Sequence, residues 1–237
     1  MEHDRTDWTP ASSAPRPAGR AAQKAATRAA ISAAVLDLME ERGFGSFTAE
    51  EAARAAGVSR RTFFNHFSSV EEACFSYSTD LMTELTRRAA EGMARGANYL
   101  QAMLDGTEGM STWPELHAAA RGTLAWEAAH HHNLSDQKYV QMTWVRAERA
   151  AGELIAGLAH LGGPSVGTPG EEERRAYLGS AIVAVCGRAF SRWATLCGGQ
   201  TGPESLLELE RHMRRALIVL LHGNTWPHPQ PEPPREG

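Results

Sequence analysis

Apolar residues recur at helical spacing along nearly the whole chain, and this pattern constrains the fold more than any other feature. In the first such segment the recurring residues are Ile31, Val35, Leu38 and Met39. Ala and Leu are abundant, and no alternating apolar and polar run is long enough to predict a strand. The sequence therefore predicts an all-α protein.

Proline-rich segments mark both ends of the chain. Residues 1–20 contain Pro10, Pro15 and Pro17, and residues 224–237 include the run TWPHPQPEPPREG. Both segments would bury almost no apolar surface, so we expect them to be disordered. Hydrophobic residues make up 42% of the chain, which is ample for a buried core between these ends.

We expect a soluble, cytoplasmic protein with no contact to a membrane. Asp4 and Asp7 stand where a signal peptide needs positive charge, and the longest uncharged apolar run, 176–187, is too short to span a bilayer. Cys186 and Cys197 lie on one predicted helix, about 16 Å apart, too far for a disulfide. Reduced thiols fit the cytoplasm.

Charge is distributed unevenly along the chain. The net charge of −4 argues against a surface generally coated by nucleic acid. Residues 16–67, however, carry eight Lys or Arg against five Asp or Glu, a local balance of +3. The pattern indicates a small basic module attached to an acidic body.

The basic module contains a helix, a tight turn and a second short helix. Thr48 opens the first of this pair through a capping box, Gly57 permits the turn, and Ser59 can cap a helix over 60–67. With a supporting helix over 24–42, these elements predict a three-helix, helix-turn-helix domain whose last helix enters the major groove. We assign residues 21–68 to this domain.

The side chains of the last helix are of types that read DNA. Phe63 and Phe67 can anchor it on the supporting helix, and the other residues then lie on the open surface. Arginine forks onto guanine, asparagine pairs with adenine, and phenylalanine contacts a thymine methyl group, whereas threonine and histidine suit the phosphates. The predicted groove contacts are Arg60, Arg61, Phe64 and Asn65, and the predicted phosphate contacts are Thr62 and His66.

Residues 24–72 resemble the DNA-binding domain of the TetR (tetracycline-repressor) family of bacterial regulators. The matching pieces are ERGF at the end of the first helix, the threonine that opens the second, AGVS in the turn, and an aromatic-rich helix closing in HF. The resemblance implies a dimeric repressor whose C-terminal body binds a small effector. The DNA contacts that it implies are Thr48, Arg60, Arg61, Thr62, Phe64, Asn65 and His66.

Two positions depart from the family pattern. Phe64 lacks the hydroxyl that this position usually offers to a phosphate, and Val70 stands where many members have lysine. Our hypothesis is that Arg16, Arg20 and Lys24, on an N-terminal arm, compensate by reaching the DNA backbone or minor groove.

The remainder, 69–223, is predicted to be a larger helical domain for ligand binding and dimerisation. Its helices are expected at about 69–95, 98–105, 113–132, 138–161, 172–197 and 204–222. The last two are strongly apolar and predict a four-helix dimer interface; the alternative is that they complete a monomeric core. The expected interface residues are Ile182, Val185, Ala189, Met213, Leu217 and Leu220.

Dimerisation also suits DNA recognition. One short helix reads too few bases, whereas a two-fold dimer reads half-sites about 34–36 Å apart. The expected partner is therefore a palindromic, double-stranded DNA operator.

Aromatic and polar-tipped residues gather in the middle helices and predict a mostly apolar effector pocket. Each of them has an alternative interpretation as ordinary core. The candidates are Trp113, His117, Trp126, His130, Met142, Trp144 and Tyr177.

The phrase EAAHHHN suggests another class of protein. Glu127 and His130 have the Glu-x-x-His spacing of helical metal sites, but such sites need a second phrase of this kind, and we find one only. A solvated helix end explains the histidines better. We expect no metal, no cofactor and no enzyme activity, because no catalytic motif stands out.

The sequence thus predicts a ligand-responsive DNA-binding transcriptional regulator, most simply a repressor released by a small, largely apolar effector. The alternative is a helical metal- or small-molecule-binding protein whose N-terminal module mediates protein contacts.

Overall fold

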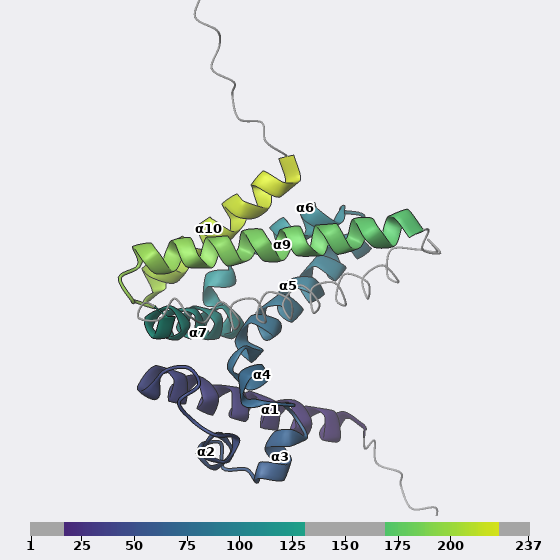
Figure 1. The fold of residues 1–237 in the computed structure, drawn as a ribbon. Coiled ribbons are helices and arrows are strands. Elements are labelled where there is room, and N and C mark those ends of the chain that lie inside the picture. The colour runs from purple at the N-terminus through teal and green to yellow at the C-terminus, as the bar shows by residue number, and fades with distance from the viewer. Residues whose placement is uncertain (1–16, 131–168, 223–237) are drawn as a thin grey trace, which may run out of the picture.

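The computed structural model describes residues 17–130 and 169–222, which form helices joined by short loops (Figure 1). No strand occurs in these two ranges, so the all-α prediction is confirmed there. None of the helices in them is long and apolar enough to cross a membrane. The elements are α1 (Pro17–Arg42), α2 (Ala49–Ala55), α3 (Arg60–Phe64), α4 (Val70–Cys74), α5 (Ser76–Ala94), α6 (Tyr99–Gly106), the 3-10 helix η1 (Met110–Thr112), α7 (Pro114–His130), α9 (Pro169–Leu196) and α10 (Pro203–His222). The helix predicted over 138–161 lies outside the described residues.

Side-chain caps fix the starts of the short helices as the sequence predicts. The Thr48 hydroxyl accepts a hydrogen bond from the Glu51 N–H at 3.2 Å, and the Glu51 carboxylate accepts one from the Thr48 N–H at 2.9 Å. The Ser59 hydroxyl accepts a hydrogen bond from the Thr62 N–H at 3.0 Å. Gly57 supplies the left-handed turn between α2 and α3, with φ at +66°.

Helix ends differ from the prediction at two places. Helix α1 begins at Pro17, so residues 17–20 of the predicted disordered arm are helical, as proline favours in a first turn. Arg20 and Lys24 therefore lie exposed on α1 and not on an arm, while Arg16 lies outside the described residues. Helix α3 ends at Phe64 instead of residue 67, because the next residues form a tighter turn, with His66 N–H donating to Phe63 C=O at 2.9 Å.

The long helix predicted from residue 69 to about 95 is broken. Helices α4 and α5 meet at Phe75, whose φ and ψ of −98° and 6° interrupt the helix. The side chains of Ala73 and Cys74 in α4 are buried in the same core as those of α1, α2 and α3. The core of α1, α2 and α3 therefore continues past the boundary predicted between residues 68 and 69, and we call residues 17–74 the N-terminal unit.

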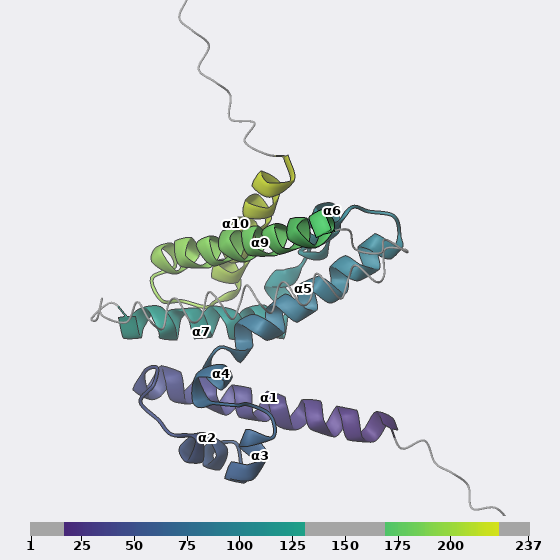
Figure 2. The ribbon, with the colours of Figure 1, turned by 45° about the vertical axis from the view of Figure 1, so that its right-hand side comes forward.

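The N-terminal unit and the body are packed directly on each other. In Figures 1 and 2, α1 lies between α7 on one side and the pair of α2 and α3 on the other. Ala125 of α7 is part of the N-terminal core. The other core, in the body, includes Leu85, Met103, Met110, Leu116, Ile182, Trp193, Leu206, Leu209 and Met213.

Ion pairs join the two parts at their exposed edges. The Arg121 guanidinium on α7 donates to Asp37 at 2.8 Å and to Glu40 at 2.8 Å, both on α1. Arg28 of α1 lies 3.7 Å from the Asp80 carboxylate on α5. Helix α1 is thus attached to two helices of the body.

The three cysteines are free thiols, as the sequence predicts. Burial raises the pKa of both Cys74 and Cys186 to about 12, which keeps these thiols protonated near neutral pH.

A buried carboxylate holds α10 against the loop before α7. Glu210 accepts hydrogen bonds from the Gly109 N–H at 3.1 Å and the Ser111 N–H at 2.9 Å. One turn later, Arg214 donates to the Thr107 hydroxyl at 3.0 Å. These contacts join residues about a hundred positions apart in the sequence and should contribute to stability.

We expect Glu210→Ala to lower the free energy of unfolding by about 3 kcal/mol, because two backbone N–H groups lose a charged acceptor in a partly buried place. Glu208→Ala is the matched control: its exposed carboxylate pairs with Arg211 on the same helix, and its loss should change stability little. Urea unfolding followed by circular dichroism measures both. Equal losses in the two variants would contradict the role of Glu210.

Candidate functional site

Two buried phenylalanines hold α3 in place. Phe63 and Phe67 are 0% and 1% exposed, and their ring centroids lie 5.8 Å apart. They share the N-terminal core with Ile31 and Val35 of α1 and Ala52 of α2. One side of α3 and of the turn after it is therefore fixed against two helices.

The opposite side of α3 is open to solvent. Arg60, Arg61 and Asn65 are exposed, and 44% of the Phe64 surface is accessible. The Arg60 guanidinium lies over the Phe64 ring, 5.2 Å from its centroid. The four residues predicted to read a DNA groove thus share one outward surface, which we call the recognition surface.

The other predicted DNA contacts lie beside this surface and are less free. Thr48 is exposed, but its hydroxyl caps α2. The Thr62 hydroxyl lies 2.8 Å from the Ser59 hydroxyl, and His66 is half-buried. These side chains are already engaged in local hydrogen bonds or packing, so most of the free donors belong to the recognition surface.

Arg28 joins the turn after α3 to α5 of the body, a role that the sequence did not indicate. Its guanidinium lies 4.4 Å from the Phe67 ring centroid and donates to the His66 C=O at 3.3 Å. Its other partner is Asp80, whose pKa is raised by burial and lowered less by Arg28 itself. The Arg28 side chain therefore contacts both the turn after α3 and a residue of α5.

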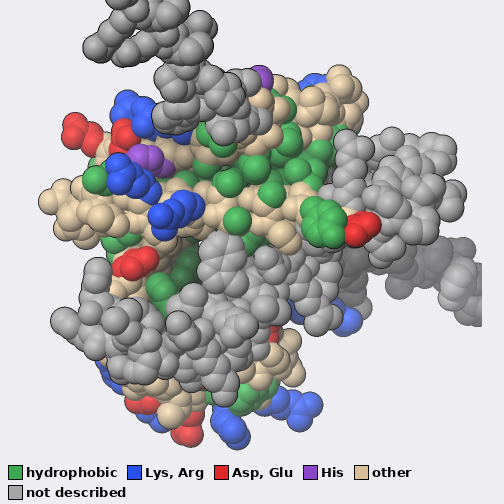
Figure 3. Space-filling model, turned by 45° about the horizontal axis from the view of Figure 1, so that its top comes forward, with side chains coloured by type: hydrophobic (Ala, Val, Ile, Leu, Met, Phe, Trp, Pro, Cys, Tyr) green, Lys and Arg blue, Asp and Glu red, His purple; other side chains and the backbone are tan. Residues whose placement is uncertain are grey.

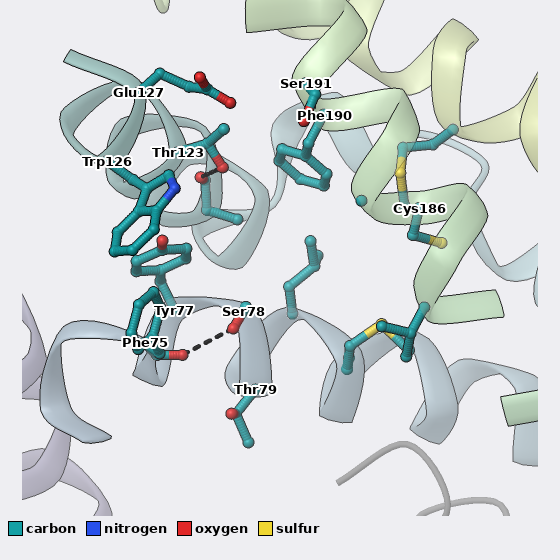
Figure 4. A pocket seen from close by; sticks show the side chains of 16 residues that line it. Phe75, Tyr77, Ser78, Thr79, Thr123, Trp126, Glu127, Cys186, Phe190 and Ser191 are labelled. Carbon is teal, nitrogen blue, oxygen red and sulfur yellow. Dashed lines mark hydrogen bonds between the residues drawn. The ribbon is translucent and has the colours of Figure 1, made fainter. Parts of the chain in front are cut away.

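A cavity of about 220 Å³ lies in the body between α5, α7 and α9. Figure 4 shows the rings of Phe75, Tyr77 and Trp126 grouped on one side of it, with Cys186 and Phe190 of α9 across from them. The remaining apolar lining residues are Leu81, Met82, Ala119, Val183 and Met213. Such a lining suits a largely apolar molecule.

Four serine or threonine side chains and one carboxylate also line this pocket. The Thr123 hydroxyl donates to the Ala119 C=O at 2.8 Å, and the Ser78 hydroxyl donates to the Phe75 C=O at 2.8 Å. Both hydroxyl protons are thereby already used within the chain. Among the described lining residues, Glu127 is the one charged side chain.

A missing side chain on α7 makes room for Tyr77. A Cβ atom at Gly122 would lie 2.3 Å from the Tyr77 Cε1 atom. Burial, with smaller contributions from Cys74 and Glu127, raises the pKa of Tyr77, so its phenol stays protonated. The glycine therefore fixes one wall of the pocket.

The structure brings one of the predicted ligand residues, Trp126, to this pocket. Trp113 instead lies in the body core beneath the Arg88 guanidinium, which is 3.8 Å from its ring centroid. His117 is exposed, and Tyr177 is 67% exposed and donates to a glutamate on its own helix. These three residues do not line this pocket, because helical spacing does not say which helices meet.

Three further ligand candidates, Met142, Trp144 and the side chain of His130, lie outside what the structure describes. The same is true of His131 and His132. Among the described residues, no three His, Cys, Asp or Glu side chains are arranged to hold a metal ion.

The predicted dimer residues lie mostly inside the chain. Val185 and Leu220 are half-buried. The four that are buried within the chain itself are Ile182, Ala189, Met213 and Leu217. A different set of apolar side chains is exposed over α9 and α10, where Figure 3 shows hydrophobic groups gathered. Its large members are Leu196, Leu207, Ile218 and Val219.

Comparison with known proteins identifies the N-terminal unit. Residues 31–72 match the family model described as "Bacterial regulatory proteins, tetR family". The match runs from the middle of α1 into α4 and contains the whole recognition surface. No curated protein matches the chain.

Several solved structures align with most of this chain. FadR from Thermus thermophilus, a TetR family transcriptional repressor in complex with lauroyl-CoA, is 22% identical over 87% of this chain and 98% of its own, with a TM-score of 0.49. A putative TetR-family regulator from Mesorhizobium loti is 15% identical over 84% and 97%, with a TM-score of 0.43. Because these TM-scores are below 0.5, the ligand of one does not transfer to this chain.

We expect Gly122→Ala to destabilise the protein by about 1–3 kcal/mol, because the new methyl group overlaps the Tyr77 ring and the ring must move. Gly19→Ala is the matched control: it also lies in a helix, but no atom is within 4 Å of its Cβ position. It should be neutral or slightly stabilising, since alanine favours helix more than glycine. Thermal or urea unfolding measures both; a fully stable Gly122→Ala protein would contradict this packing.

Proposed function

The N-terminal unit of this chain belongs to the tetR family of bacterial regulatory proteins, and we propose that the protein is a homodimeric repressor that a small, largely apolar effector releases from its operator. The observation that carries this proposal is the two-sided character of α3. Phe63 and Phe67 are buried, and Arg60, Arg61 and Asn65 on the other side are exposed. A structural helix would gain little from two exposed arginines beside an exposed phenylalanine.

The recognition surface supports reading of the major groove. Arg61 is suited to fork onto the O6 and N7 atoms of a guanine, and Asn65 to pair with adenine. Phe64 has no hydroxyl for a phosphate, but its exposed ring fits a thymine methyl group and holds the Arg60 guanidinium beside it. The operator should therefore contain G·C and A·T pairs at fixed positions of each half-site.

The exposed apolar side chains on α9 and α10 support a dimer. Val219 is 60% exposed and Ile218 is 41% exposed, both on α10, and Figure 3 shows hydrophobic side chains gathered over α9 and α10. A contiguous exposed apolar patch marks an interaction site. Pairing these helices with their symmetry mates would cover them. The two recognition surfaces would then face half-sites about 34–36 Å apart.

The pocket between α5, α7 and α9 supports binding of an effector. Its aromatic wall is built on Phe75, the residue at which α4 of the N-terminal unit meets α5. A ligand shifts the protein away from its DNA-binding form only through a difference in affinity for the two forms. Because this pocket wall lies at the junction between the N-terminal unit and the body, an effector bound there would favour one relative position of these two parts over another.

Duplexes selected from a random-sequence library by the full chain would test this function. Arg61→Ala should lower the affinity for the selected duplex by about 1–3 kcal/mol and relax the base preference at one position of each half-site. Arg95→Ala, which removes an exposed arginine at the end of α5, is the charge-matched control and should bind like the wild type.

A salt titration of the same complex checks the partner. Log affinity should fall by about 0.9 per neutralised phosphate for each decade of salt. Recovery of no duplex, or an affinity and base preference unchanged by Arg61→Ala, would contradict the proposal.

A further inference from the structure

Three aromatic rings from separate segments meet where α7 lies over the end of α1. The Trp126 ring centroid is 4.8 Å from that of Phe44, with the rings nearly perpendicular at 83°, and 5.2 Å from that of Phe75. Phe44 and Phe75 are themselves 5.2 Å apart. Each ring contacts the other two, so the three move as one cluster, which we call the aromatic bridge.

The aromatic bridge has one side in the pocket and one side in the N-terminal unit. Phe75 and Trp126 line the pocket, whereas Phe44 does not. Phe44 belongs to the loop between α1 and α2 and packs against the N-terminal core. A molecule that displaces the Trp126 ring therefore acts on the N-terminal unit with no residue in between.

Displacement of Phe44 would reach the DNA-binding residues through the backbone. Gly43 and Gly45 on either side of it have φ angles of +85° and +74°, so the path of this loop depends on two left-handed residues. Thr48 follows at the start of α2, and α2 holds α3 through the shared core. The path of this loop thus determines the position in space of the first turn of α2.

The ion pairs at the same boundary are less suited to this role. The Arg121 and Glu40 side chains are 36% and 40% exposed, so solvent screens their attraction. Neither lines the pocket, and the same holds for Arg28 and Asp80. These pairs hold the N-terminal unit in place but do not feel directly whether the pocket is occupied.

We propose that the aromatic bridge couples the pocket to the recognition surface, so that pocket occupancy and DNA binding each bias the position of Trp126. This inference rests on the proposed function, because it concerns the regulation of the same DNA-binding protein. Coupling between two sites is reciprocal. DNA binding should therefore alter the surroundings of Trp126 even with no effector present, and the coupling can be tested before an effector is known.

The experiment uses the full chain labelled with 5-fluorotryptophan and the duplex recovered by selection. The fluorine signal of Trp126 is assigned from its absence in Trp126→Phe. In the wild type this signal should shift when the duplex saturates the protein. The signal of Trp193, buried between α9 and α10 where its N–H donates to Ser205, should stay and serves as an internal reference.

Phe44→Leu removes one ring of the bridge without touching the pocket lining, and the duplex-induced shift of Trp126 should be lost. Phe47→Leu is the matched control, because Phe47 is a buried phenylalanine three residues away in the same loop and is not part of the bridge. It should keep the shift. If Phe44→Leu does not fold, Phe44→Met replaces it with the same expected loss, because the flexible methionine side chain adapts to an irregular gap.

Two results would overturn the inference: a Trp126 signal that does not move in the wild type while the duplex is bound, or an equal shift in the wild type and in Phe44→Leu. Binding of the duplex is measured separately by electrophoretic mobility. If the protein binds the duplex but the Trp126 signal does not shift, only the role of the aromatic bridge is contradicted. If the protein binds no duplex, the proposed function is contradicted as well.

Discussion

The burial of Phe63 and Phe67 is the interaction on which the recognition surface depends. Helix α3 has five residues, too few to be stable by itself. Its position comes from these two rings, which fill the core between α1 and α2. Because Phe63 and Phe67 occupy the inner side of α3 and of the turn after it, the two arginines and Asn65 are left on the outer side. Sequence, packing and the proposed readout are therefore linked at one short helix.

The same packing joins the recognition surface to the rest of the molecule. The Arg28 guanidinium lies over the Phe67 ring and also forms an ion pair with Asp80 of α5. On the other side of α1, Ala125 of α7 completes the N-terminal core and the aromatic bridge lies beside it. The DNA-binding unit is thus not a separate body on a linker. A small change in how α7 meets α1 must also change where α3 points, since tightly packed cores transmit strain.

Features set by local sequence could be predicted, because their energetics are local. The caps at Thr48 and Ser59 and the left-handed turn at Gly57 depend on residues at most three positions away, and all agree with the structure. The recognition surface also follows from the spacing of Phe63 and Phe67. The break at Phe75 did not follow, because it depends on Ala73 and Cys74 packing into a core made by other helices.

Features set by tertiary contacts could not be predicted from spacing. Helix α9 is apolar on more than one side, so its periodicity does not separate Ile182, which is buried in the chain, from an outward face. Tyr77 was missed as a pocket residue because its place depends on Gly122 of another helix. Two aromatic residues two positions apart, Phe75 and Tyr77, were the one signal in the sequence that could have indicated this wall.

The central claim is that α3 enters the major groove with its exposed side toward the bases. Guanine N7 lies in that groove, so dimethyl sulfate footprinting of the selected duplex tests the claim directly. The account predicts protection of guanine N7 in both half-sites, about one helical turn apart. Bound protein that leaves every guanine N7 as reactive as in free DNA would contradict it.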